Sequence, residues 1–131
     1  MPFAIIEVGR RWTDDQEVAI MDAVHNALVA AFKIPQHDRH VRLIEHAPHR
    51  FAAPPTLAQP EFSTLVSIDC LAGRSLDAKR ALYREIVERL EPVGIPRDHV
   101  SIVIRDSPAE NWGIWGGQAA SDVDLGFAVN V

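Results

Sequence analysis

The sequence is poor in several features that mark particular protein classes. Its 131 residues include one cysteine, Cys70, so no internal disulfide can form, and we expect a cytoplasmic protein in a reducing environment. No apolar run approaches the roughly 20 residues of a membrane-spanning helix, and the N-terminus lacks the basic and then apolar layout of a signal peptide. We therefore expect no membrane partner.

Positive charge is also scarce. Thirteen Lys and Arg residues stand against eighteen Asp and Glu residues, which gives a formal net charge of −5 at pH 7. Proteins that bind the phosphate backbone of nucleic acids usually carry the opposite balance. The chain also contains neither a phosphate loop nor a GxGxxG motif. These absences argue against nucleic acid as a partner.

The chain contains an internal repeat. Apolar residues of one predicted helix recur 62 positions later in a second: Ile20 and Leu82, Val24 and Ile86, Leu28 and Leu90. Each helical segment lies between two apolar, strand-like segments. Residues 2–46 and 64–106 are therefore predicted to be two strand–helix–strand units, joined by the proline-rich connector 47–62. Such short crossovers favour parallel pairing of the strands within each unit.

Two such units predict one α/β domain over residues 1–131, an α+β two-layer sandwich with four strands and two helices on one face. Beyond the second unit, residues 110–131 predict a C-terminal hairpin and a final strand, because apolar residues alternate from position 123 to position 131. The face of the sheet without helices is expected to be partly apolar, with Ile6, Val66 and Ile68 on it. An uncovered apolar face favours a homo-oligomer.

Pro2 is a candidate for catalysis. Removal of Met1, which is expected when proline follows, would make Pro2 a free secondary amine at the start of a strand. An α-amino group has an ordinary pKa of about 7.7–8.0, which burial or neighbouring cations lower, so such an amine could act as a general base near neutrality. The alternative is that Pro2 only begins the strand, a position that proline tolerates.

Two arginines are candidates for binding an anion. Arg74 stands between a predicted strand and a predicted helix, where its guanidinium and the unpaired N–H groups of the helix could bind a carboxylate. The alternative is a solvated surface arginine. Arg42 lies within a strand, on the face opposite Val41 and Leu43, where a salt bridge in an oligomer would also explain it.

Histidines and tryptophans gather in two further segments. Two HxxH spacings occur within thirteen residues: His37 and His40, His46 and His49. This spacing suits ligands on a helix, whereas these residues straddle loops and a strand, so we expect no metal site. Trp112 and Trp115 stand in a glycine-rich turn, where they could wall a small pocket or seal a hairpin or subunit contact.

The chain resembles the tautomerase superfamily, whose members use an amino-terminal proline and are built from β-α-β units. The resemblance is carried by Met1 and Pro2 at the first strand, by AGRSLDAKRAL at 72–82, by IPRDHVSIVIRD at 95–106 and by ENWGIWGGQAAS at 110–121. The fused two-unit length is similar to the branch that contains malonate semialdehyde decarboxylase and its tautomerase-like relatives. The resemblance implies a homotrimer and no cofactor.

The same resemblance implies roles for individual residues. Asp38 matches the aspartate that assists the proline in the decarboxylase branch, and Arg74 matches one of its two arginines. The position of the other arginine is Ala72 here. Arg42 resembles the substrate-binding strand arginine of 4-oxalocrotonate tautomerase, and Trp112 falls where that enzyme has an active-site phenylalanine.

These residues together predict a cofactor-free keto–enol tautomerase that acts on a small 2-oxo or enol carboxylate. Pro2 would move the proton, Asp38 would orient the Pro2 ammonium or a water, Arg74 and Arg42 would hold the carboxylate, and Trp112 would exclude solvent. The first alternative is decarboxylation or hydration of a 3-oxo acid such as malonate semialdehyde, with a cationic Pro2. The second is a non-catalytic trimer that binds a carboxylate.

Overall fold

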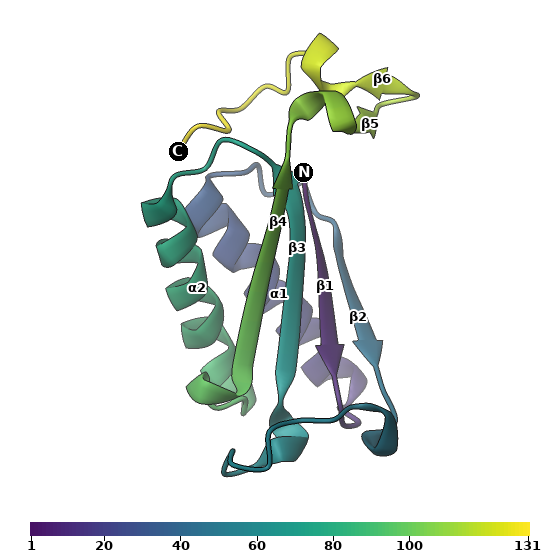
Figure 1. Ribbon diagram of the computed structural model, residues 1–131, viewed down its shortest axis with the longest axis vertical. Helices are drawn as coiled ribbons and strands as arrows, with labels where there is room; N and C mark the ends of the chain where they lie inside the picture. The colour runs from purple at the N-terminus through teal and green to yellow at the C-terminus, as the bar shows by residue number, and fades with distance from the viewer.

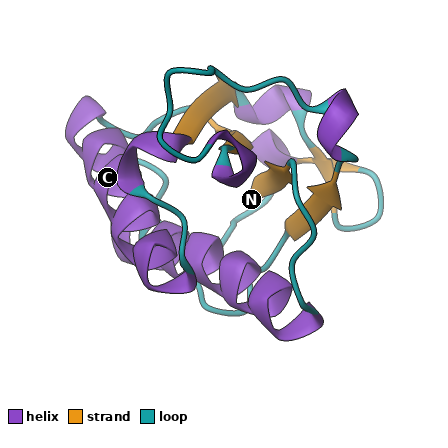
Figure 2. Cartoon of the chain, turned by 90° about the horizontal axis from the view of Figure 1, so that it is seen from below, coloured by secondary structure: helices purple, strands orange, loops and turns teal.

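A four-stranded sheet with two α-helices on one face forms the protein in the computed structural model, which describes residues 1–131 (Figure 1). Figure 2 shows the helices together on one side of the strands. The predicted α+β two-layer sandwich is confirmed. The elements follow in chain order as β1 (Pro2–Val8), α1 (Asp14–Phe32), β2 (Val41–Glu45), β3 (Thr64–Leu71), α2 (Leu76–Leu90) and β4 (Val100–Ser107).

The order of the strands joins the two units at the centre of the sheet. The strand order is β2-β1-β3-β4, with β1 parallel to β2, β3 parallel to β4, and β1 antiparallel to β3. In the central pair Pro2 lies opposite Cys70, and Val8 lies opposite Thr64. The start of β1 therefore lies beside the end of β3. The end of β4 reaches the same edge of the sheet, because β4 runs parallel to β3.

Both helices begin at the capping residues that the sequence indicates. The Thr13 side chain accepts a hydrogen bond from the Gln16 backbone N–H at 3.2 Å, and Gln16 Oε1 accepts one from the Thr13 N–H at 3.0 Å, which completes a capping box. Ser75 caps α2 by accepting from the Ala78 N–H at 3.1 Å. The cap of α2 fixes the backbone directly after Arg74.

The main core lies between the sheet and the helices. Ile6, Val66 and Ile68 are fully buried there, so their expected place on the outer face is wrong. A strict alternation along a strand identifies two faces but does not say which of them the helices cover. The outer face instead carries half-exposed apolar residues, among them Ile44 and Val103.

Short elements occupy most of the connections. The 3₁₀ turns are η1 (Pro48–Arg50), η2 (Pro60–Phe62), η3 (Glu91–Val93), η4 (Arg97–His99), η5 (Ala109–Asn111) and η6 (Ala120–Asp122), and a small hairpin is formed by β5 (Gly113–Ile114) and β6 (Gln118–Ala119). The hairpin lies above the amino end of β1 in Figure 1. None of the helices has the length and apolar character needed to cross a membrane.

The predicted final strand is absent, and residues 123–131 follow an irregular path toward the start of α2. Their apolar alternation has another cause, because Leu125 and Val129 pack on a small apolar cluster around Met1, whereas Phe127 packs on the main core. Gly126 adopts a φ of 80°, which breaks an extended conformation between these residues. The alternating apolar residues of this segment therefore contact two different apolar clusters and do not form a paired strand.

The core packing of α2 gives a first prediction. Leu82 is fully buried, so Leu82→Ala should lower the free energy of unfolding by roughly 2–5 kcal/mol through lost burial and the cavity left behind. Leu76→Ala on the same helix is the matched control, because Leu76 is 59% exposed. Urea denaturation of both variants measures the difference. Equal losses for the two variants would contradict this account of the core.

Candidate functional site

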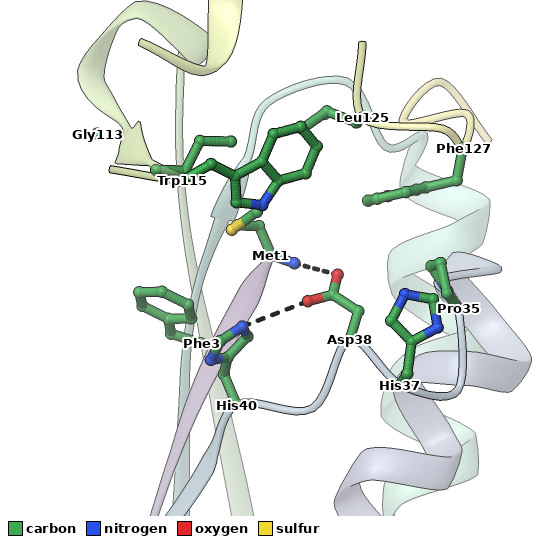
Figure 3. Close-up of a pocket in the computed structure, with 11 residues that line it drawn as sticks. Met1, Phe3, Pro35, His37, Asp38, His40, Gly113, Trp115, Leu125 and Phe127 are labelled. Carbon is green, nitrogen blue, oxygen red and sulfur yellow. Dashed lines mark hydrogen bonds and ion pairs between the residues drawn. The ribbon is translucent and has the colours of Figure 1, made fainter. Parts of the chain in front are cut away.

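A pocket of about 360 Å³ opens at the amino end of β1 (Figure 3). Its walls come from β1, from the loop 33–40 between α1 and β2, from the β5–β6 hairpin, and from the irregular segment 123–131. Segments far apart in the sequence meet here because the antiparallel pairing of β1 with β3 brings the start of β1 to the edge where β3 and β4 end.

The centre of the pocket is an ion pair between the backbone amine of Met1 and the Asp38 carboxylate (Figure 3). Only about a tenth of the Asp38 side chain is exposed. Burial lowers the pKa of the Met1 amine below its ordinary value of 8.0, the hydrogen bond and charge of Asp38 raise it, and the charge of Arg74 lowers it further, with a net lowering. A larger share of this amine is therefore unprotonated near neutrality than for an exposed amine, as general-base catalysis requires.

Arg74 lies in the turn between β3 and α2 and is 6% exposed. Its Nη1 donates to the Leu71 carbonyl oxygen at 3.0 Å, and its guanidinium lies 4.8 Å from the centre of the Phe32 ring. Its Nε and Nη2 have no hydrogen-bond partner in the structure. Burial lowers the pKa of Arg74, although the group stays charged. Buried N–H donors of a cation without partners are suited to an anionic ligand.

The Met1 side chain occupies the space between the amino end of β1 and the turn after β3. It is buried in the small apolar cluster with Leu71, Ile114 and Ala120. Cys70, opposite Pro2, is fully buried, and this burial raises the pKa of its thiol. At this position Cys70 behaves as a small hydrophobic residue of the core.

The open side of the pocket is bounded by aromatic residues. Trp115 extends from the β5–β6 hairpin over the amine, and Phe127 faces it from the irregular segment (Figure 3). Trp115 has a left-handed φ of 48°, in a turn completed by Gly116 and Gly117. This uncommon backbone conformation aims a large side chain at the pocket although the indole is 55% exposed.

The predicted site residues do not all meet at the pocket. Asp38 lines it, and Pro2 and Arg74 lie at the same edge of the sheet. Trp112 lies behind the pocket wall, where its Nε1 donates to Ser107 Oγ at 2.9 Å and its ring meets Phe3 edge-on, with a separation of 5.2 Å between the ring centres.

Arg42 faces a different opening. It lines a neighbouring cleft of about 280 Å³ together with Phe3 and His40, which also belong to the pocket wall. No role for His37 or His40 could be predicted from the sequence, and Trp115 had two alternatives, a pocket wall or a seal. All three residues line the pocket. The dense polar segment around Asp38 was the available signal for the histidines. No group of three or more His, Cys, Asp or Glu side chains is arranged to hold a metal ion.

Comparison with known proteins identifies the family of the chain. Two family models, both described as tautomerase enzyme, match residues 38–115 and residues 2–57. A 2-hydroxymuconate tautomerase from Comamonas testosteroni is 44% identical over 50 residues, which cover 37% of this chain and 79% of that protein. A probable tautomerase from Bacillus subtilis is 29% identical over 103 residues, which cover 76% of this chain and 80% of that protein.

Solved structures with the same fold cover nearly the whole chain. A malonate semialdehyde decarboxylase inhibited by 3-bromopropiolate has a TM-score of 0.81 and 28% sequence identity, with 94% of this chain and 98% of that chain covered. The native fused 4-OT has a TM-score of 0.80 at 23% identity, with 95% and 99% covered. The second likeness concerns the fold alone.

The pairing of the amine with Asp38 gives a prediction for the site. Because Asp38 raises the pKa of the amine through its hydrogen bond and its charge, Asp38→Asn should lower that pKa further below its ordinary value. An NMR titration of the amino-terminal residue measures the midpoint. Asp15→Asn, at an exposed position in the first turn of α1, is the control and should leave the midpoint unchanged. A rise in the midpoint in Asp38→Asn would be the opposite of this expectation.

Proposed function

Because the chain belongs to the tautomerase family, we propose that it interconverts the keto and enol forms of a small 2-oxo carboxylate in the cytoplasm, with Pro2 as general base once Met1 is removed. The observation that supports this proposal is the position of the amino-terminal amine, here that of Met1, which lies in a pocket at the start of β1, pairs with Asp38 and has a lowered pKa. A secondary amine at the same strand end would meet the same carboxylate.

Removal of Met1 would also open space for the substrate. The Met1 side chain fills the apolar cluster with Leu71 and Ile114, directly before the turn that carries Arg74. Without that side chain, this volume becomes part of the pocket. A carboxylate entering it could satisfy the Nε and Nη2 groups of Arg74 that lack partners.

The reaction then follows from these positions. Arg74 binds the substrate carboxylate and stabilises negative charge as it develops on the enolate oxygen. The Pro2 nitrogen takes the proton from the enol hydroxyl and returns it to carbon, which gives the keto acid and regenerates the free amine. Asp38 stabilises the ammonium that exists between the two transfers.

The remaining site residues have supporting roles in this proposal. Trp112 excludes solvent by holding Phe3 in the pocket wall. Arg42 could reach a carboxylate only across the wall formed by Phe3 and His40, so Arg74 is the principal carboxylate ligand. No cofactor takes part.

We also propose that the protein assembles as a homotrimer. Its outer sheet face carries half-exposed apolar residues such as Ile44 and Val103, and solved fused 4-OT structures of this fold are described as trimers. Burying these side chains against other copies would remove apolar surface from water. Light scattering on the purified protein measures the mass of the assembly, and a monomer would contradict this part of the proposal.

The direct test of Pro2 is the ketonisation of phenylenolpyruvate, followed spectroscopically. Pro2→Ala replaces the secondary amine with a primary amine that the proline ring no longer holds in place. This change should lower kcat/KM by about 100-fold or more, the usual scale for a general base. Intact mass establishes in both proteins that Met1 has been removed. Equal rates would exclude Pro2 as the base, and a cellular protein that keeps Met1 would support the non-catalytic carboxylate-binding alternative.

The role of Arg74 can be tested separately. Arg74→Gln removes the charge from the proposed carboxylate site and should raise KM by roughly 10-fold to 100-fold, the value of one charge-assisted hydrogen bond. Arg80→Gln is the matched control, because Arg80 lies on the exposed face of α2 and pairs with Asp77. An unchanged KM in Arg74→Gln would remove Arg74 from the binding site.

A second candidate function is decarboxylation or hydration of a 3-oxo acid such as malonate semialdehyde. It is favoured by the 28% identity and the TM-score of 0.81 to a malonate semialdehyde decarboxylase. In that reaction a protonated Pro2 polarises the carbonyl and Asp38 activates water. Burial and the charge of Arg74 lower the pKa of the Met1 amine, and the same surroundings at Pro2 would favour the free base and with it the tautomerase.

The pH dependence of kcat/KM separates the two functions. A base must be unprotonated, so tautomerase activity should fall as the pH decreases through the pKa of the Pro2 amine. An acid must be protonated, so decarboxylase activity should instead fall as the pH increases through the same range. The rate profile of each reaction is measured with its own substrate between pH 5 and 9. A ketonisation rate that rises toward acid would contradict the general-base mechanism.

A further inference from the structure

His40 pairs with the second oxygen of the Asp38 carboxylate. Its Nε2 lies 3.4 Å from Asp38 Oδ1, whereas the amine pairs with Asp38 Oδ2 (Figure 3). One buried carboxylate therefore lies between two basic groups. The mechanism above uses the amine and the carboxylate and leaves the imidazole without a function.

Packing and exposure suit His40 to act on Asp38. Its ring lies on Phe3, with 4.6 Å between the ring centres, which fixes the imidazole at the wall of the pocket. About half of its side chain is exposed, so it can exchange protons with water. Histidine is the side chain type whose charge ordinarily changes between pH 5 and 8.

The charged groups around His40 come from every neighbouring element. Asp38 and His37 belong to its own loop, the amine belongs to β1, and Arg74 lies in the turn after β3. On the other side of the ring, Arg39 and Arg42 line the neighbouring cleft, and Arg39 forms an ion pair with Asp22 of α1. Among these groups, Asp38 is the anion within ion-pair distance of His40.

We propose that His40 is a positioning residue of this site, which competes with the amino-terminal amine for the Asp38 carboxylate and so keeps the amine available as a base in mild acid. The inference rests on the proposed function. A charged imidazole draws Asp38 toward itself and also repels an ammonium ion nearby. Both effects disfavour protonation of the amine, so they act in the same direction.

The consequence is that a proton on His40 disfavours a proton on the amine. When the imidazole carries a charge, the amine resists protonation because Asp38 faces a second cation. Ketonisation then continues to a lower pH than the amine and Asp38 alone would allow. A residue with a purely structural role would change the rate at every pH and leave the midpoint of the profile in place.

A charge series at position 40 tests this inference. His40→Gln keeps a polar side chain without a charge, whereas His40→Lys carries a charge throughout the range. The acid midpoint of kcat/KM should rise by about half a pH unit or more in His40→Gln and should lie at or below the wild-type value in His40→Lys. For His40→Gln, kcat/KM should fall about threefold at pH 6 and stay within about twofold at pH 8.5. His49→Gln, in the exposed η1 turn, is the matched control and should leave the profile unchanged.

An NMR titration of the amino-terminal amine in the same proteins separates this inference from the proposed function. If the midpoint depends on the charge at position 40 but no Pro2-dependent ketonisation is found, the coupling stands and the proposed function fails. If ketonisation depends on Pro2 and the midpoint is the same in the wild type, His40→Gln and His40→Lys, the role of His40 is overturned and the proposed function remains. Circular dichroism establishes that each variant is folded, and the comparison of wild type with His40→Gln decides alone if His40→Lys does not fold.

Discussion

The antiparallel pairing of β1 with β3 is the constraint on which the rest of the structure depends. It joins two parallel strand–helix–strand units into one sheet, and its register places Pro2 opposite Cys70. Only in this arrangement does the start of the chain meet the turn that carries Arg74. The same pairing brings the end of β4, and the hairpin that follows it, to this edge of the sheet. The pocket is therefore a product of the sheet order.

The electrostatics of the pocket depend on three charged groups that are largely shielded from solvent. The amine, Asp38 and Arg74 are all largely buried, so each charge acts strongly on the others. Burial and Arg74 favour the free amine, and Asp38 favours the ammonium ion. A base that must both accept and release a proton benefits from such opposed influences, because neither protonation state is held too firmly.

Much of the fold and part of the site could be predicted from the sequence. Helical spacing and caps such as Thr13 and Ser75 are local signals, and the structure agrees with them. The buried faces of β1 and β3 and the irregular path after Asp122 could not be predicted, because they depend on contacts between distant segments. Asp38 could be predicted from family likeness, whereas His40 acquires its position only when the loop packs on Phe3.

The proline-rich connector 47–62 lies at the opposite end of the sheet from the amine (Figure 1). Pro55 and Thr56 are exposed there. By contrast, the Val131 carbonyl oxygen accepts a hydrogen bond from the Ser75 N–H at 2.9 Å, beside Arg74. A fluorescent label or a surface linker is therefore best attached near Thr56. Attachment at residue 1 would block the proposed base, and attachment beside Val131 would disturb the backbone next to Arg74.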